Sequence, residues 1–138
     1  MTSYYVDTCV WRDYFENRFG QRGRPLGEFA AKFFFKAIKK RDVILFSDLL
    51  VKELKTAFSN EEIEQMLGIV SNFGLLKLGE VSKNDFIEAQ KISGERALPF
   101  GDVLHAIASR NNNAVLITQD KHFEKLRDFA VVKRPQEI

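Results

Sequence analysis

The stretch PFGDVLHAIASRNNNAVLITQDKHF, residues 99–123, decides the fold that we expect for the whole chain. A helix begins after its proline and glycine and carries an acid, Asp102, in its first turn. Three asparagines at 111–113 form a turn, and the apolar run AVLI at 114–117 reads as a short buried strand. A second acid, Asp120, follows that strand. Short, continuously apolar strands beside helices are typical of parallel sheets in α/β proteins.

The same alternation of strands and helices extends outward over the rest of the chain. Further runs that favour strands lie at residues 3–6, 43–46, 75–78 and 130–132. Helical spacing of apolar residues, or a capping pattern at the start, predicts helices over residues 10–15, 26–38, 48–58, 59–74, 82–92 and 121–127. This order of elements predicts an α/β fold with a mostly parallel sheet.

The composition is that of an ordinary globular chain of 138 residues, with 45% hydrophobic and 29% charged residues. Its length predicts one domain over residues 1–138. The single cysteine, Cys9, excludes an intramolecular disulfide. It fits a reducing compartment, so we expect a cytoplasmic protein in which Cys9 is a small buried apolar residue. We see neither the pattern of a signal peptide nor an apolar window long enough to span a membrane.

Four acids occupy positions that a metal site would need. Asp7 follows the first strand, and Asp120 follows the fourth. Ligands in open α/β sheets bind beyond the carboxyl ends of the strands, where the strand order reverses. These two acids converge if their strands are neighbours at that point. Asp102 begins its helix, and Glu53 lies on or beside the apolar face of its own helix.

Carboxylates gathered at one place repel one another, and like charges about 4 Å apart cost on the order of 4 kcal/mol at an effective dielectric of about 20. A hard divalent cation relieves this repulsion, and it can activate water and hold a phosphodiester for in-line attack. Each acid alone also has a structural explanation. Asp7 suits a helix N-cap, Asp102 suits the helix dipole, and Asp120 suits a turn. Glu53 is the hardest to explain in this way, because inward-facing glutamates rarely stay unpaired.

Four segments, in order, resemble the successive motifs of PIN-domain nucleases, in particular VapC-type toxins and their stand-alone prokaryotic relatives. They are VDTCV at 6–10, SDLLVKEL at 47–54, GDVLHAIA at 101–108 and LITQDKHF at 116–123. The resemblance covers nearly the whole chain. It implies a Rossmann-like, three-layer α/β/α sandwich around a five-stranded, mostly parallel sheet. It also implies a Mg²⁺- or Mn²⁺-dependent endoribonuclease that leaves a 5′-phosphate and a 3′-hydroxyl.

The resemblance gives each of the four acids a role. Asp7 and Asp102 would bind the metal directly, and Asp120 would bind it directly or through water. Glu53 would orient the attacking water or assist its deprotonation. All four acids are therefore predicted to be catalytic.

Two hydroxyls and two histidines stand close to these acids in the sequence. Thr118 matches a hydroxyl that often lies near the metal in the family, and Thr8 is a weaker match. His105 lies one turn after Asp102, and we interpret it as a packing or hydrogen-bonding residue. His122 is interpreted as a surface residue at a helix cap, with contact to a phosphate as the alternative.

A basic, phenylalanine-rich segment sets this chain apart. Residues 18–41 carry eight Lys or Arg and one acid, although the net charge of the chain is only +2. Such a segment suits a polyanion, and a solvated helix face explains it equally well. The candidate RNA-backbone contacts are Arg12, Arg18, Arg22 and Arg24. The resemblance implies a homodimer and a small antitoxin bound across an apolar groove, and the aromatics of 29–35, with Phe35 off the apolar stripe, suggest such a surface.

Other functions stay open on the sequence alone. A housekeeping RNA-processing nuclease would use the same acids. A non-catalytic RNA- or protein-binding module with this fold would not need all four of them. A phosphatase with an aspartate nucleophile, of the haloacid-dehalogenase type, would need a second acid two residues after Asp7, and Cys9 stands there instead.

Overall fold

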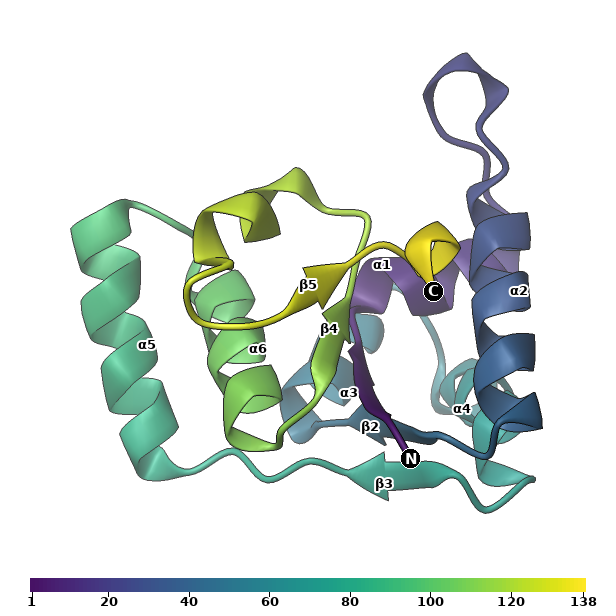
Figure 1. Cartoon of the computed structure of the whole chain (residues 1–138), viewed down its shortest axis with the longest axis horizontal. Coiled ribbons are helices and arrows are strands. Elements are labelled where there is room, and N and C mark those ends of the chain that lie inside the picture. Colours follow the sequence, from purple (N-terminus) through teal and green to yellow (C-terminus); the bar gives the residue numbers. More distant parts are fainter.

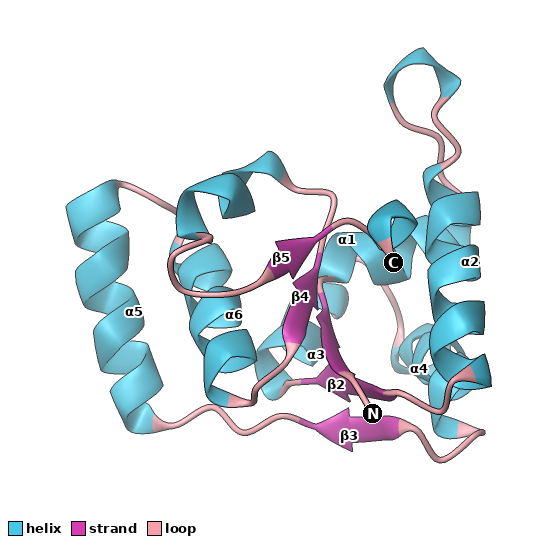
Figure 2. Ribbon diagram, viewed as in Figure 1, coloured by secondary structure: helices cyan, strands magenta, loops and turns pink.

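The structure, a computed structural model, describes residues 1–138 and is built around a parallel sheet of five strands (Figures 1 and 2). The strands are β1 Ser3–Val6, β2 Val43–Phe46, β3 Leu76–Leu78, β4 Val115–Ile117 and β5 Val132–Lys133. Their order across the sheet is β3-β2-β1-β4-β5, and all neighbouring strands are parallel. The chain builds the sheet outward from β1 to β3 and then returns to add β4 and β5 on the other side. The strand order therefore reverses between β1 and β4.

Helices cover both faces of this sheet. They are α1 Thr8–Glu16, α2 Leu26–Lys39, α3 Asp48–Leu54, α4 Asn60–Ser71, α5 Lys83–Arg96 and α6 Phe100–Asn111. α5 and α6 lie on one side of the sheet, and α1, α2 and α4 lie on the other (Figure 1). Along β1, Tyr4 and Val6 belong to one hydrophobic core and Tyr5 belongs to the second, because successive side chains of a strand point to opposite faces. The three-layer α/β/α sandwich is thus confirmed.

Serine caps fix where three of the helices begin. The Ser47 hydroxyl accepts a hydrogen bond from the amide of Leu50 at 3.1 Å and starts α3. Ser59 and Ser82 each form a capping box with an acid three residues later, at the starts of α4 and α5. None of the helices is both long and apolar enough to cross a membrane.

The aromatic side chains of α2 mostly face inward. Phe33 and Phe34 are buried, with exposed fractions of 1% and 2%, and they pack against Tyr4 and Trp11 of the neighbouring elements. Phe35 alone is prominently exposed, at 71%. The expected apolar surface over residues 29–35 is therefore wrong for Phe33 and Phe34, because the helical period turns these two neighbouring phenylalanines into the core.

The helix expected over 48–58 is shorter than predicted and ends at Leu54. The Thr56 hydroxyl donates to the carbonyl of Glu53 at 2.6 Å, and a local bond of this kind competes with the helical ladder. The helix expected over 59–74 ends at Ser71, three residues before Gly74 in its left-handed conformation.

The C-terminal segment departs further from the prediction. Residues 121–126 form a 3₁₀ helix, and the last strand lies at 132–133 instead of 130–132. The amide of Ala130 bonds to the carbonyl of Leu126 at 3.1 Å and closes a turn, so it does not pair with β4. The strand consequently starts two residues late.

Candidate active site

The carboxyl ends of β1 and β4 lie side by side, where the strand order reverses. The amide of Asp7 donates to the carbonyl of Ile117 at 2.9 Å, which holds together the residues that follow the two strands. Asp7 is the N-cap of α1, and its Oδ1 accepts a hydrogen bond from the amide of Thr8 at 2.8 Å. Its Oδ2 accepts one from the hydroxyl of Thr118 at 2.8 Å. Burial raises the pKa of Asp7, so its charged form depends on these donors.

Glu53 reaches the same place from the last turn of α3. Its Oε1 accepts hydrogen bonds from the hydroxyl of Thr8 at 2.7 Å and from Nε2 of His105 at 2.9 Å. Partial burial acts to raise the pKa of Glu53, but the hydrogen bond and charge of His105 and the bond from Thr8 outweigh it and lower the pKa. Its Oε2 faces Gly101, where a Cβ would lie 3.1 Å from that oxygen. Any side chain at Gly101 would therefore press on Glu53.

Asp102 and Asp120 form a second acidic group, together with His122. Asp120 follows β4, and its Oδ1 accepts a hydrogen bond from the amide of His122 at 2.9 Å. Nδ1 of His122 lies 3.2 Å from Oδ2 of Asp102 and 3.4 Å from Oδ1 of Asp120. Burial, followed by the charges of Asp120 and Asp7, raises the pKa of Asp102 to about 6. The negative charges of the two groups therefore act on one another.

Thr118 joins the two groups. Its hydroxyl donates to Asp7 and accepts a hydrogen bond from the amide of Asp120 at 3.0 Å. The possible metal ligands form two groups, which are Asp7, Glu53 and His105, and Asp102, Asp120 and His122. Within each group, one possible ligand atom of each residue lies within 4.8 Å of the ligand atoms of the other two residues. The structure thus places the four predicted acids in two linked pairs, each with a histidine. Thr118 lies between the pairs, and Thr8 lies within the first.

The donor set fits a hard divalent cation. Carboxylate oxygens dominate both groups, and Mg²⁺ and Mn²⁺ prefer oxygen ligands in proteins. Partial burial and the neighbouring negative charges favour the neutral form of Asp102, and a cation bound between the acids would stabilise its charged form. The two acid pairs could therefore share such an ion.

The structure revises the interpretation of Cys9 and His122. Cys9 is half-buried and packs against one hydrophobic core, as expected of a small apolar residue, but its Sγ also donates to Oδ2 of Asp7 at 3.3 Å. Burial and the charge of Asp7 raise the pKa of the Cys9 thiol. His122 is an exposed residue at a helix cap, as predicted, and its backbone amide donates to the cap residue Asp120, but its side chain also contacts the acids. Its position two residues after Asp120 was the sequence signal that could have predicted this contact.

His105 is buried, with an exposed fraction of 1%, and both of its ring nitrogens have partners. This confirms its interpretation as a hydrogen-bonding residue. Burial acts to lower the pKa of His105, but the bond to Glu53 and the charge of Asp7 outweigh it and raise the pKa. Its bond to Glu53 was not visible in the sequence, because 52 positions separate the two residues.

A basic pocket of about 270 Å³ lies next to Asp120. The basic residues that line it are Arg24, Lys121, Arg127, Lys133 and Arg134. Arg127 and Arg134 pair with glutamates, whereas Arg24, Lys121 and Lys133 make no ion pair. The sequence prediction had missed the two lysines, which come from the 3₁₀ helix and from β5.

The four arginines predicted to contact RNA have different surroundings. Arg12 pairs with Glu16 at 3.2 Å, and Arg18 lies 3.8 Å from a carboxylate oxygen of Asp13. Arg22 and Arg24 lie on the loop between α1 and α2, which projects from the body of the protein (Figure 1). Of the four, only Arg24 lines the basic pocket beside the acids.

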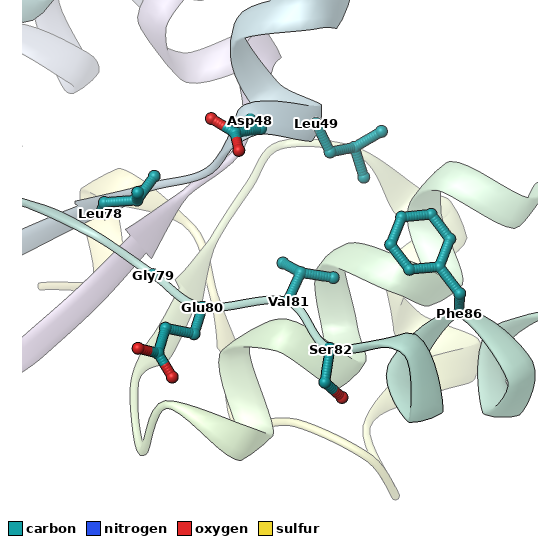
Figure 3. A pocket seen from close by; sticks show the side chains of 8 residues that line it. All are labelled: Asp48, Leu49, Leu78, Gly79, Glu80, Val81, Ser82 and Phe86. Atoms are coloured by element: carbon teal, nitrogen blue, oxygen red, sulfur yellow. The ribbon is translucent and has the colours of Figure 1, made fainter.

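A separate pocket of about 420 Å³ lies at the end of the edge strand β3. Leu49 of α3, Val81 and Phe86 of α5 gather around its apolar side (Figure 3). None of the four acids lines it, so the acidic site and this pocket are different places.

The chain resembles known proteins in both sequence and structure. The family model for the PIN domain matches residues 4–128. The structure is similar to that of VapBC2 from Rickettsia felis bound to a DNA fragment from their promoter, with a TM-score of 0.66, 17% identity, and 96% of this chain and 98% of that chain covered. It is also similar to FitAcB from Neisseria gonorrhoeae, with a TM-score of 0.60, 15% identity, and 97% and 99% covered. No curated protein matches the chain.

The chain belongs to the PIN-domain family, whose members are nucleases. The matched range begins in β1 and ends just after the 3₁₀ helix, so it includes both acid pairs and Thr118. The two solved structures share the fold of this chain over nearly its whole length.

Proposed function

We propose that this chain is a divalent-metal-dependent endoribonuclease of the VapC toxin type, a single nuclease domain over residues 1–138 that works in the cytoplasm. One observation carries the proposal: two acid pairs meet around Thr118 at the reversal of strand order, in a chain of a nuclease family. The pairs are Asp7 with Glu53 and Asp102 with Asp120. With a divalent cation bound, such a site suits hydrolysis of a phosphodiester. The reaction develops negative charge, which carboxylates alone would repel and the cation would stabilise.

Asp7, Asp102 and Asp120 would hold Mg²⁺ or Mn²⁺. When bound, the ion would polarise the scissile phosphate and favour deprotonation of the attacking water. The chain itself holds the acids in place. Thr118 ties Asp7 to the backbone that carries Asp120, and the N-cap bond ties Asp7 to α1.

Glu53 would orient the attacking water and accept its proton. Its Oε1 already accepts two hydrogen bonds, from Thr8 and His105. This leaves Oε2 as the oxygen that can receive a proton from water. The lowered pKa of Glu53 keeps the carboxylate in the charged form that a proton acceptor requires.

Removal of divalent ions is expected to stop cleavage of single-stranded RNA. Without a cation the acids repel the phosphodiester, and the water is not activated. The measurement follows a labelled RNA on a gel, in EDTA and then after addition of excess Mg²⁺ or Mn²⁺. We expect background rates in EDTA and recovery with either ion. Cleavage at an unchanged rate in EDTA would exclude a metal-dependent mechanism.

The basic pocket would bind the RNA backbone next to the site. Arg24, Lys121 and Lys133 make no ion pair, so their charges are available to phosphates. Arg22, on the same projecting loop, would add a peripheral contact. Arg12 and Arg18 each lie beside an acid, which weakens their part in the predicted RNA surface.

The variant Lys133→Gln is expected to weaken RNA binding several-fold and to reduce the slope of log affinity against log salt by about 1, because one phosphate contact is lost. Lys77→Gln is the matched control. Lys77 is also an exposed strand lysine, but it lies on β3 at the opposite edge of the sheet. Fluorescence anisotropy with an inactive Asp7→Asn background measures both. Equal effects of the two lysine variants would refute a role for this pocket.

A small antitoxin and a second copy of the chain are the proposed protein partners. The fold shared with VapBC2 and FitAcB, which are toxin–antitoxin complexes, supports the antitoxin. The exposed Phe35 offers an apolar contact for one of these partners.

Growth arrest on expression that disappears with Asp7→Asn would separate a toxin from a housekeeping RNA-processing nuclease. A monomeric mass in light scattering would contradict the homodimer.

A further inference from the structure

A chain of hydrogen bonds runs from Glu53 into the core between the sheet and α6. Nε2 of His105 lies 2.9 Å from Oε1 of Glu53, and Nδ1 of His105 lies 2.6 Å from the hydroxyl of Tyr5. That hydroxyl lies 2.6 Å from the hydroxyl of Ser47, which accepts the amide hydrogen of Leu50 at 3.1 Å. The exposed fractions of Tyr5, Ser47 and His105 are 0%, 0% and 1%. These contacts connect β1, α3 and α6 over sequence separations of up to 100 residues.

The core between the sheet and α6 contains three buried polar side chains, those of Tyr5, Ser47 and His105. Burying a polar group is unfavourable unless it is hydrogen-bonded, and apolar residues of similar shape would avoid that cost. No buried side-chain nitrogen or oxygen lacks a hydrogen-bond partner, so this chain of hydrogen bonds is complete. Its outer end is Glu53, whose side chain is 34% exposed. The polar chain therefore connects the core to a carboxylate of the acidic site and to no other polar surface group.

The bonds restrict how the carboxylate of Glu53 can turn. A carboxylate only accepts hydrogen bonds, so Nε2 of His105 donates to Oε1 whichever charge the ring carries. The hydroxyl of Thr8 donates to the same oxygen at 2.7 Å. Two donors therefore hold Oε1, and Oε2 is left pointing toward Gly101 at the start of α6. Rotation of the carboxylate would break both bonds.

We propose that His105, Tyr5 and Ser47 are positioning residues that lock the carboxylate of Glu53 so that Oε2 faces the reacting water. This inference rests on the proposed nuclease function. Ser47 holds the Tyr5 hydroxyl, Tyr5 holds the His105 ring, and His105 holds Glu53. Partners of this kind, one step away from the reacting groups, commonly affect activity by about 10–100-fold.

The adjacent tyrosine provides a matched control. Tyr4 and Tyr5 are consecutive residues of β1, and both are buried. The ring of Tyr4 packs against Phe33 in the opposite core, whereas the hydroxyl of Tyr5 belongs to the polar chain. Replacement of either tyrosine by phenylalanine removes one oxygen and preserves the ring. Only the change at Tyr5 affects the support of Glu53.

The first test compares steady-state cleavage of a short single-stranded RNA by the full chain. Tyr5→Phe is expected to lower kcat by about 10-fold with KM changed by less than about 2-fold, because substrate contacts are untouched. Tyr4→Phe is expected to retain the activity of the unmodified chain. A wild-type kcat for Tyr5→Phe, or equal losses for both variants, would overturn the proposal.

A second pair of variants separates positioning from packing. His105→Gln keeps an N–H donor that can reach Glu53, whereas His105→Leu keeps a buried side chain without a donor. We expect His105→Gln to retain distinctly more activity than His105→Leu when both fold, as judged by circular dichroism. Equal activity in the two variants would mean that the donor does not matter, and would overturn the proposal.

A measurement without RNA keeps this inference distinct from the proposed function. The chain has two histidines, so ¹⁵N NMR of the imidazole rings resolves them readily. Tyr5→Phe and Glu53→Gln should each shift the ring nitrogens of His105 and leave those of His122 in place, and Tyr4→Phe should shift neither. An unmodified chain that never cleaves RNA would overturn the nuclease function. Unchanged His105 signals in Tyr5→Phe would overturn the polar chain itself.

Discussion

Replacement of Asp7 by asparagine is expected to reduce RNA cleavage by about 1,000-fold or more, since loss of a metal ligand removes several kcal/mol of charge stabilisation in the transition state. The fold should persist. Asparagine is as good an N-cap as aspartate, so the amide of Thr8 keeps an acceptor at the start of α1. The hydroxyl of Thr118 can rotate to accept a bond from the new amide group, because a hydroxyl both donates and accepts.

Asp42→Asn is the matched control for this change. Asp42 is buried to a similar degree, 5% exposed against 7% for Asp7, and its Oδ1 also accepts one backbone amide hydrogen, from Thr2. It lies just before β2, at the amino ends of the strands, far from the acid pairs. Cleavage rates are measured for the two variants, each checked for folding by circular dichroism. Only Asp7→Asn is expected to lose cleavage. Wild-type cleavage by Asp7→Asn would refute the acidic site as the catalytic centre.

Asp102→Asn is expected to stabilise the protein when no divalent ion is present. The pKa of Asp102 in the folded state, about 6, lies above its ordinary value of 3.8. The folded protein therefore favours the protonated carboxyl, and folding stability falls as the pH rises from about 4 to about 6. Above that window the charged Asp102 destabilises the fold by on the order of 1–2 kcal/mol, after allowance for solvent screening.

The helix dipole opposes the stabilisation by Asp102→Asn only in part. Asp102 lies in the first turn of α6, where a negative charge contributes about 0.3–1 kcal/mol that asparagine would lose. The net gain at pH 7.5 in EDTA should raise the Tm by about 2–5 °C. At pH 4 the difference should disappear, because both side chains are then neutral. Excess Mn²⁺ should reverse the order, since the unmodified chain would bind the ion more tightly. A lower Tm for Asp102→Asn at pH 7.5 in EDTA would contradict the repulsion.

Most of the fold follows from local patterns in the sequence. The strand VILF at 43–46 and the serine-capped helix starts coincide with the structure, because short-range propensity and tertiary packing agree there. The brief helix predicted over 121–127 is present at 121–126, but its 3₁₀ form and the late start of β5 were not predictable in this way. Their positions depend on pairing with β4 and on the closing bond of Ala130, which are tertiary contacts.

The placement of the four acids also followed from the sequence, because each stands at the end of a predictable element. What supports them did not. The hydroxyl of Tyr5 meets His105 across 100 residues, and Lys133 approaches Asp120 only because β5 pairs with β4. No short-range pattern records contacts of this kind. The pairing of His105 with Glu53 was missed for the same reason, whereas His122 lies only two residues after Asp120.

Anomalous X-ray diffraction from a crystal soaked in Mn²⁺ would test the metal site most directly, because it locates the ion without any assay of activity. We predict an anomalous peak between the two acid pairs, with Asp7, Asp102 and Asp120 around it, and loss of that peak in Asp7→Asn. A soaked crystal with manganese bound elsewhere, and none among these acids at millimolar concentration, would contradict the proposed catalytic centre.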